Sequence, residues 1–365
     1  MKRTRTTPGD VAQQVRQSAQ PRPSDKGGRG LLIPTGSTLL NLALSDSLEG
    51  GWGIGKVANL IGDSSSGKTL LALTMFAEMS RLKEFDDYRL IYDDVEHALE
   101  FNLAELFGRK MAERVESPGQ DKAGEPKNSD IIQDFQCFVD DALKDGRPFV
   151  YVLDSLDALT SKQEQEKVGK MMDAHRKEAQ IAGSYGMDNP KIASQMLRMI
   201  KGKVKDTSSL ILIISQTRDN IDPMSFEKKT RSGGRALRFY SCHEVWLAMA
   251  GKVKGKGDRV IGNDVKFKVS KNKLTGKLRE GFFTIYYDYG ADDVASCIEF
   301  LEDEKHWEKA GQALVAPEFD FKGTHKALVK KIEDEGLEPK LRGIVGQVWG
   351  EIEEGLKLNR KSKYE

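Results

Sequence analysis

A short glycine-rich segment constrains this chain more than any other feature. The residues Gly62-Asp-Ser-Ser-Ser-Gly67-Lys68-Thr69 lie between an apolar run, residues 57–61, and a stretch of helical character, residues 70–79. This is the Gly-x4-Gly-Lys-Thr pattern in the strand–loop–helix context that a phosphate-binding loop requires. Glycines let backbone N–H groups wrap around phosphates, and the start of the helix adds partial positive charge. The segment predicts a nucleotide site in which Lys68 reaches the β- and γ-phosphates and the Thr69 hydroxyl binds Mg²⁺.

The apolar segments predict an α/β fold with a mostly parallel central sheet flanked by helices. The first four runs are short, almost entirely apolar and separated by helical stretches, as expected of buried parallel strands. The later runs follow one another after short turns, which predicts an antiparallel extension of the sheet. The expected strands are residues 57–61, 90–93, 149–154, 210–215, 244–249, 265–269 and 282–287.

An acid ends the third of these runs. Asp154 directly follows Phe149-Val-Tyr-Val-Leu, where a carboxylate can hold the water shell of a Mg²⁺ ion beside Thr69. Aspartate is also a common turn former after strands, so the position alone is a weak signal. Together with the phosphate loop, it favours the metal role.

Four acids follow the second run, in Leu90-Ile-Tyr-Asp93-Asp94-Val-Glu96-His-Ala-Leu-Glu100. Strand alternation places one or two of them at the carboxyl edge of the sheet, where open α/β folds bind their ligands. One of them could orient and deprotonate an attacking water molecule. The alternative is an acidic turn that caps a helix, and the residues by themselves leave both interpretations open.

Composition excludes several classes of protein. Hydrophobic residues make up 38% and charged residues 31% of the 365, which suits a globular protein and excludes a fully disordered one. No apolar run approaches the ~18 residues of a membrane span, and the basic N-terminus lacks the apolar segment of a secretory signal. Three cysteines are too few for a disulfide framework or a zinc site, and the five histidines show no ligand spacing. We therefore expect a cytoplasmic protein.

Local charge and composition divide the chain into three parts. The net charge of +1 hides basic segments, since residues 1–30 carry seven Lys/Arg against two Asp and residues 251–280 carry ten against three acids. Such segments attract nucleic acid even when the total charge is near zero, and solvated surface charge is the alternative. We expect a basic N-terminal arm (1–30), a nucleotide-binding core (31–290) and a small C-terminal α/β domain (291–365) anchored by Trp307 and Trp349.

Many collinear motifs resemble those of bacterial RecA-type recombinases. The acid-Val-Glu96-His-Ala-Leu segment resembles the catalytic-glutamate motif of that family, and its order and spacing relative to the other motifs hold from about residue 31 to 290. A weaker match extends to residues 308–311. The resemblance implies a RecA-like P-loop ATPase core. The other matching segments are Thr35-Gly36-Ser37, Leu153-Asp154-Ser155, Ala158-Leu159-Thr160, Ser194-Gln195, Arg198, Gln216, Gly233-Gly234, Ala236-Leu237, Phe239-Tyr240 and Lys271-Asn272-Lys273.

The resemblance implies roles in ATP hydrolysis for matching residues. Glu96 would be the general base, and Gln216 would sense the γ-phosphate, although a polar residue leaving a strand is the plain alternative. Lys271 and Lys273 would cross a subunit interface to the γ-phosphate bound by the neighbouring chain, although in isolation they form an ordinary solvated turn. Thr69 and Asp154 would bind Mg²⁺. The ATP-binding residues would be Gly62, Asp63, Ser64, Ser65, Ser66, Gly67, Lys68, Thr69, Glu100 and Tyr287.

The resemblance also implies two DNA-binding loops, at about residues 161–190 and 217–234. In the second, glycines let the backbone lie close to a phosphate while Arg and Lys neutralise it. The first leads into a helix on which positions 191, 194 and 198 share one face, so three donors could follow one DNA backbone; a solvated helix face is the alternative. The DNA-binding candidates are the apolar wedge Met187 together with Lys191, Ser194, Arg198, Arg218, Lys228, Lys229, Arg231, Gly233 and Gly234.

The chain departs from the family pattern at several points. The adenine pocket of the family uses an Asp and, three residues later, a Tyr, whereas this chain has Glu100 and Leu103, which predicts weaker adenine stacking. The first loop is longer and more charged than in bacterial relatives, and the N-terminal arm does not match the polymerisation segment. The C-terminus is basic rather than acidic. Such divergence is what a phage-encoded relative would show.

The leading hypothesis is a DNA-dependent ATPase that polymerises on single-stranded DNA and exchanges homologous strands. It would use ATP and Mg²⁺. Its partners would be single-stranded DNA, homologous double-stranded DNA, further copies of itself in a helical filament, a single-strand binding protein and mediator proteins, with no membrane. An ATP-modulated annealing or DNA-coating accessory and a ring helicase on the same core are the alternatives. The Lys271-Asn-Lys273 element and the C-terminal domain favour the recombinase.

Overall fold

One large sheet organises the computed structural model, which describes residues 30–176, 188–219, 229–231, 234–311 and 313–361. The strand order is β14-β13-β12-β11-β3-β9-β8-β4-β5, with β10 beside β9. Strands β11, β3, β9, β8, β4 and β5 run parallel, and β11 to β14 form an antiparallel extension. The predicted α/β fold is therefore confirmed. The strands are β3 (Lys56–Gly62), β4 (Arg89–Asp94), β5 (Val115–Glu116), β8 (Phe149–Asp154), β9 (Leu210–Asp219), β10 (Lys229–Arg231), β11 (His243–Lys254), β12 (Val260–Asn272), β13 (Glu280–Tyr286) and β14 (Gly290–Asp292).

Both faces of the parallel strands are buried. In β9, Leu210, Leu212 and Ile214 point into one apolar cluster, whereas Ile211 and Ile213 point into another. Side chains of a strand alternate between its two faces, so continuous apolar runs of this kind need cover on both sides. The first face is covered by α2 (Thr38–Ser45) and α3 (Lys68–Arg81), and the second by α6 (Ile132–Asp145) and α8 (Asp188–Asp206).

The register of the sheet brings the predicted functional segments to one edge. Gly62, the last residue of β3, lies opposite Gln216 of β9. Asp94, the last residue of β4, lies opposite Asp154, the last residue of β8. Because these strands are parallel, their carboxyl ends open toward the same side of the domain.

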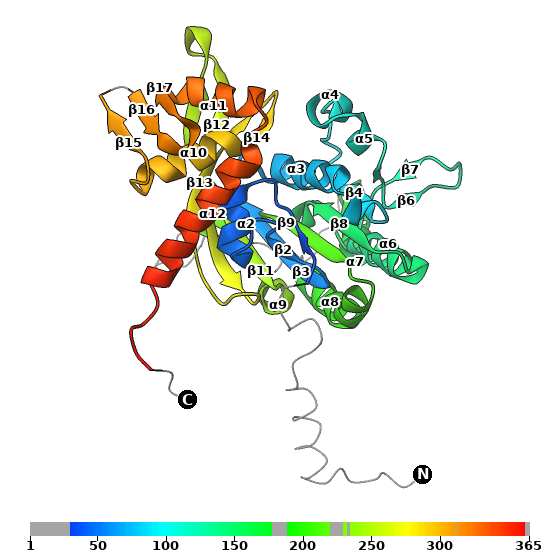
Figure 1. Cartoon of the computed structure of the whole chain (residues 1–365). Helices are drawn as coiled ribbons and strands as arrows, with labels where there is room; N and C mark the ends of the chain where they lie inside the picture. Colours follow the sequence, from blue (N-terminus) through cyan, green and yellow to red (C-terminus); the bar gives the residue numbers. More distant parts are fainter. Residues whose placement is uncertain (1–29, 177–187, 220–228, 232–233, 312, 362–365) are drawn as a thin grey trace.

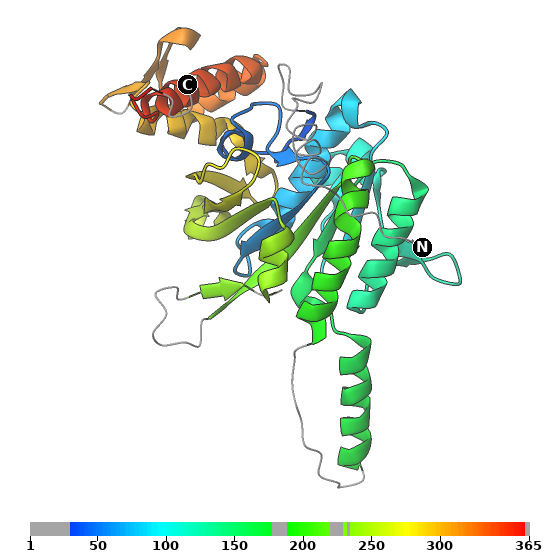
Figure 2. The same ribbon diagram turned by 90° about the horizontal axis from the view of Figure 1, so that it is seen from below.

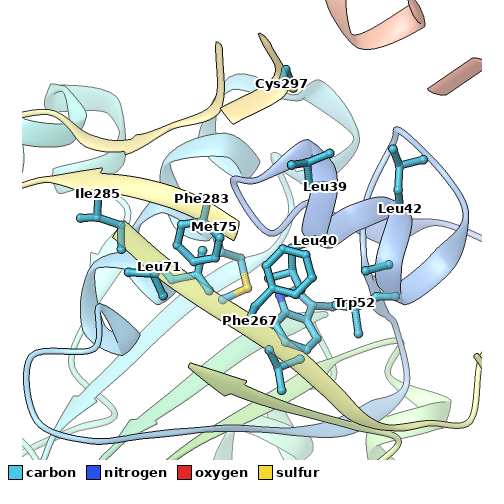
Figure 3. Packing of buried hydrophobic residues seen from close by; sticks show 14 of the residues in the cluster. Leu39, Leu40, Leu42, Trp52, Leu71, Met75, Phe267, Phe283, Ile285 and Cys297 are labelled. Atoms are coloured by element: carbon cyan, nitrogen blue, oxygen red, sulfur yellow. The ribbon is translucent and has the colours of Figure 1, made fainter. Parts of the chain in front are cut away.

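The C-terminal part of the chain packs against the antiparallel extension of the sheet. Phe267 of β12 and Phe283 of β13 stack with ring centroids 6.1 Å apart, beside Leu40, Trp52 and Met75 (Figure 3). The same apolar cluster continues into the C-terminal domain at this end of the sheet (Figure 1). That domain contains α10 (Asp293–Asp303), β15 (Glu308–Ala310), β16 (Ala313–Ala316), β17 (Phe321–Gly323), α11 (His325–Asp334) and α12 (Glu338–Gly355).

The C-terminal domain is thus a small α/β unit packed on the core. Trp307 and Trp349 are 2% and 9% exposed, so both are buried as the sequence predicts. The core sheet extends slightly beyond residue 290, because β14 pairs with β13 through Asp292. The remaining described α-helices and strands are short: β1 (Leu32–Ile33), β2 (Trp52–Gly53), α4 (Leu103–Phe107), α5 (Arg109–Ala112), β6 (Gly119–Gln120) and β7 (Pro126–Lys127).

The two segments expected as loops contain regular structure in the residues that the structure describes. Helix α7 (Lys162–Arg176) occupies much of residues 161–190 and projects from the body of the molecule (Figure 2). In the second segment, β9 continues to Asp219, pairs with β10 and is followed by α9 (Gly234–Tyr240). Met187, Lys228, Gly233 and the N-terminal arm up to residue 29 lie outside the described residues. None of the helices described here is long and apolar enough to cross a membrane.

Candidate nucleotide-binding site

The phosphate loop joins β3 to α3 and depends on its glycines. Gly67 has φ +86° where it precedes α3, a conformation that other residues rarely adopt. At Gly62, a Cβ atom would lie 2.6 Å from the carbonyl oxygen of Leu247 on β11 and closer still to the Ser66 hydroxyl. Both positions therefore exclude a side chain, which is the physical reason for the glycine pattern seen in the sequence.

Lys68 is buried inside this loop. Its amino group donates to the carbonyl oxygen of Gly62 at 3.0 Å and to that of Asp63 at 2.6 Å. Burial lowers the pKa of Lys68, while the nearby charges of Asp154 and Glu96 act in the opposite direction. Because the amino group lies at the start of α3 and is surrounded by loop carbonyls, it is positioned to exchange these oxygens for those of a phosphate.

The predicted metal ligands are in direct contact. The Thr69 hydroxyl donates to Asp154 Oδ2 at 2.6 Å, and the Tyr92 hydroxyl donates to the same oxygen at 2.7 Å. Burial raises the pKa of the Asp154 carboxyl. Within the described residues, no group of three or more His, Cys, Asp or Glu side chains could hold a metal by itself. One hydroxyl and one carboxylate fit Mg²⁺, which is commonly held by one or two protein oxygens together with water and substrate phosphates.

The predicted general base is held by two side chains. Oε1 of Glu96 accepts a hydrogen bond from the Ser155 hydroxyl at 2.5 Å and from Nε2 of Gln216 at 3.0 Å. The backbone N–H of Gln216 donates to Asp157 at 2.7 Å, which fixes the strand at this point. The arrangement brings Glu96 and Gln216 together, as the resemblance implies. The anchoring roles of Ser155 and Asp157 were not predicted, although Ser155 directly follows Asp154 and Asp157 is only three residues beyond it.

The acids beside Glu96 have separate roles. Asp93 is fully buried and accepts hydrogen bonds from Ser129 and from the Tyr151 hydroxyl, with distances between 2.6 and 2.8 Å. The carboxylate of Asp94 accepts from the backbone N–H groups of Ala98 and Leu99. Asp94 thus holds the turn that follows β4, whereas the next helix, α4, is capped by Asn102; Glu96 is the acid at the open edge.

A cavity of about 360 Å³ lies over the phosphate loop. Two exposed aromatic side chains line it, Phe101 (44% exposed) and Tyr287 (47% exposed). Tyr287 therefore lies where the resemblance implies, and its hydroxyl donates to Asn263 at 3.2 Å. Neither Glu100 nor Leu103 is among the residues that line the described cavity; Leu103 packs against the apolar core instead. Phe101 was missed, and its only signal in the sequence was its position directly after Glu100.

Lys271 and Lys273 lie away from the phosphate loop of their own chain. Their amino groups bond to carbonyl oxygens at the end of α9, Lys271 to Arg238 and Phe239 and Lys273 to Phe239. In the strand register, Lys271 of β12 lies opposite Glu244 of β11. Glu244 precedes Leu247 by three residues, and Leu247 lies opposite Gly62 at the start of the phosphate loop. At 3.3 Å per residue, this is about 10 Å back from the start of the loop along the sheet.

The described DNA-binding candidates lie on α8, on the β9–β10 hairpin and at the start of α9. On α8, Arg198 is exposed and donates to the Tyr240 hydroxyl at 3.2 Å, and Ser194 is half-buried. Lys191 also lies on α8, with its side chain outside the described residues. On the β9–β10 hairpin, Arg218 pairs with Asp157 at 3.4 Å and Lys229 pairs with Asp63 of the phosphate loop. Arg231 lies on β10, and Gly234 begins α9.

Comparison with known proteins agrees with this geometry. The model of the RecA N-terminal domain family matches residues 30–292. The chain is similar to Protein RecA of Azoarcus sp. (strain BH72), with 33% identity over 279 residues that cover 76% of this chain and 72% of the relative. It has the same identity and coverage with Protein RecA of Colwellia psychrerythraea (strain 34H / ATCC BAA-681). A phosphate loop, a RecA-type sheet and a family match across most of the chain lead to one conclusion: this protein belongs to the RecA family.

Proposed function

We propose that this protein is a DNA-dependent ATPase that forms a filament on single-stranded DNA and exchanges homologous strands. The observation that carries the proposal is the path of β9. Its residue Gln216 bonds to Glu96, and two residues later Arg218 enters the hairpin that we expect to bind DNA. A DNA-dependent ATPase needs such a link, because occupation of one site must change the other.

In the proposed reaction, ATP and Mg²⁺ supply the phosphoryl group and the charge that neutralises its oxygens. Lys68 provides the cation inside the loop, and Thr69 and Asp154, which contact each other directly, would hold Mg²⁺. Glu96 takes a proton from water at Oε2, because both hydrogen bonds from described side chains go to Oε1. Gln216 and Ser155 keep the carboxylate in this orientation. Phe101 and Tyr287, which line the cavity over the phosphate loop, would offer aromatic faces to the adenine in place of the Tyr that the family carries further along.

Lys271 and Lys273 act in the neighbouring subunit's site. Their distance from their own phosphate loop supports this assignment, since they cannot serve the same chain without leaving α9. Two subunits that dock correctly would then bring these cations to the γ-phosphate between them. Release of phosphate removes the charge that holds the interface, so hydrolysis would loosen the filament.

Electron microscopy tests the assembly. The protein is mixed with single-stranded DNA and a slowly hydrolysed ATP analogue, with Lys68→Ala as the control that cannot bind nucleotide. We expect helical filaments for the wild type and none for the control. Hexameric rings would instead support a ring helicase.

A strand-exchange assay then tests the reaction. Single-stranded circular DNA and homologous linear duplex are incubated with protein, ATP and Mg²⁺, and joint molecules are followed by gel electrophoresis. Filaments that form joint molecules support the recombinase. Filaments that coat or anneal DNA without exchanging strands would support the accessory function.

A further inference from the structure

Asp63, the first residue after β3, joins the phosphate loop to the β9–β10 hairpin. Its carboxylate accepts hydrogen bonds from the Thr217 hydroxyl and from the amino group of Lys229. Thr217 belongs to β9 and Lys229 to β10, and the two strands pair directly, with Thr217 opposite Arg231. One carboxylate of the nucleotide site therefore holds both strands of the hairpin at its base.

The backbone of Asp63 faces the other way, into the nucleotide site. Its carbonyl oxygen accepts from Lys68 Nζ at 2.6 Å. A displacement of Asp63 consequently moves an oxygen that holds the phosphate-binding lysine. Thr217 is also the neighbour of Gln216, which bonds to Glu96. The hairpin thus reaches the nucleotide site by two separate contacts.

The chemistry of Lys229 sets up a competition. Lys229 ends in an ammonium group. The carboxylate of Asp63 and a phosphate of DNA are both singly charged oxygen anions, so either can accept hydrogen bonds from that ammonium group. The hydrogen bond from Lys229 lowers the pKa of Asp63, so the carboxylate is charged at neutral pH. With 51% and 46% of the two side chains exposed, the pair is weak. An exposed pair of this kind changes an equilibrium constant by about 1.5- to 5-fold, so DNA can displace it.

We infer that Asp63 is a positioning residue that occupies Lys229 in place of a DNA phosphate and reports the arrival of DNA to Lys68. When a phosphate of single-stranded DNA takes Lys229, Asp63 keeps only its hydrogen bond from Thr217, and the loop that holds Lys68 is freer to adjust to nucleotide. The inference rests on the proposed function, since it requires that the protein binds both single-stranded DNA and ATP. The Asp63–Lys229 contact would link DNA binding to the nucleotide site within one subunit, whereas Lys271 and Lys273 would act between subunits.

The test measures binding of fluorescein-labelled oligo(dT) by anisotropy, with and without a slowly hydrolysed ATP analogue. Asp63→Asn keeps the shape of the side chain and removes its charge. We expect this variant to bind oligo(dT) about 1.5- to 5-fold more tightly without nucleotide. The factor by which the analogue changes DNA affinity should become smaller than in the wild type. By linkage, the effect of oligo(dT) on analogue affinity should shrink by the same factor.

Two further variants separate the contact from long-range charge. In the Lys229→Ala background, Asp63→Asn should change oligo(dT) affinity less than it does alone, because the competing pair is already absent. Asp86→Asn removes a similarly exposed acid that pairs with Lys110 at 3.4 Å and precedes the amino end of β4, at the edge of the sheet opposite the hairpin; it should leave both affinities unchanged. Thermal unfolding of each variant verifies that it is folded.

The outcomes are distinct. If the wild type binds neither oligo(dT) nor the analogue, the proposed function fails. Suppose that the wild type binds both and that Asp63→Asn changes oligo(dT) affinity equally in the wild-type and Lys229→Ala backgrounds. Asp63 then does not compete with DNA for Lys229, and the inference is overturned. An unchanged influence of the analogue on DNA affinity in Asp63→Asn overturns the reporting role.

Discussion

Charged side chains meet in two regions of this molecule, and they are held very differently. At the junction between the core and the C-terminal domain, Glu353 of α12 receives two bonds from Arg279, at 2.5 and 2.8 Å, and one from Lys277 at 2.7 Å. Its side chain is only 11% exposed. At the open edge of the sheet, Lys229 and Arg218 each face one acid and are more than half exposed.

A second set of contacts at the junction has the same character. Asp293 accepts from the backbone N–H and the hydroxyl of Thr38, both at 2.6 Å, and from Arg342 at 3.1 to 3.2 Å. Bidentate and shielded pairs of this kind resist exchange, whereas exposed single pairs contribute little. The ion pairs at the junction therefore hold the C-terminal domain against the core. The cations at the open edge are weakly held, so they can exchange their acidic partners for phosphates.

The largest effect should follow from Lys271→Ala/Lys273→Ala. In the isolated chain these lysines lie neither at the junction nor at the open edge, because their amino groups donate to a carbonyl oxygen at the end of α9. If they act on the neighbouring subunit, the variant binds ATP normally but loses ~10³–10⁵ of DNA-stimulated turnover, the range for trans-acting cations. Steady-state ATPase assays with and without single-stranded DNA measure this loss.

Mixing this double variant with Lys68→Ala checks the direction of the contact. An intact phosphate loop can then face intact lysines next door, so some activity should return. Lysines that act within their own chain would leave every site in the mixture defective. Lack of rescue in filaments shown to contain both variants would therefore count against the trans assignment.

Glu96→Gln should show the next largest effect. Loss of a general base removes ~10²–10⁴ in rate, while nucleotide binding should persist because Lys68 and Thr69 are untouched. Single-turnover hydrolysis and analogue binding measure the two quantities separately. Glu105→Gln, on the exposed face of the nearby α4, is the control and should hydrolyse ATP normally. If Glu96→Gln also hydrolyses at the normal rate, Asp94 becomes the candidate, since Asp93 is buried away from the edge.

Glu353→Gln tests the junction. Hydrogen bonds to charged groups contribute ~1.5–3 kcal/mol, so we expect a loss of that order in the free energy of unfolding at pH 7. Urea unfolding measures it. Glu351→Gln, whose partner on the same helix is Gln347, should lie within ~0.5 kcal/mol of the wild type.

The same pair gives a pH dependence. The bonds from Arg279 lower the pKa of Glu353 to about 2, from an ordinary value of 4.5. A carboxyl with a lowered pKa stabilises the fold fully above the unfolded value and loses that contribution as the pH falls toward the folded value. The stability difference between wild type and Glu353→Gln should therefore be constant above about pH 4.5 and shrink between pH 4.5 and 2. A difference that stays constant to pH 2 would contradict the assignment.

The smallest effects are expected from the exposed cations of α8 and of the β9–β10 hairpin. Arg198→Ala and Arg218→Ala should each weaken binding to single-stranded DNA regardless of base sequence. Each should also reduce the salt dependence of log affinity by up to ~0.7 for a lost phosphate contact. Titrations at several salt concentrations measure the slope, and Arg81→Ala on α3, which pairs with Glu78, is the control. Unchanged slopes in folded variants would remove both residues from the DNA site.

The two loops show where interpretation of the sequence was incomplete. Residues 161–190 and 217–234 are expected as loops, whereas the described part of the first contains α7 and that of the second contains the paired residues 217–219 and 229–231. Lys162–Arg176 is rich in charge, and Val168, Met171 and Met172 give it only a short set of apolar residues at helical spacing, which is a weak signal for a helix. Residues 229–231 form only a three-residue strand, which is too short for alternation to be recognised.

The sequence by itself determined the phosphate loop, the pairing of Thr69 with Asp154 and the family. These features depend on short segments whose glycines, lysine and acids have local geometric reasons, and on the alternation of apolar runs that predicts a parallel sheet. Only the tertiary structure decided which side chains hold Glu96, that Phe101 lines the cavity, and that Asp63 meets Lys229. Asp63 and Lys229 lie 166 residues apart, and their contact depends on the register of β3 against β9 and of β9 against β10. A shift of one residue in either pairing would turn the side chains to the other face, and no local pattern encodes that register.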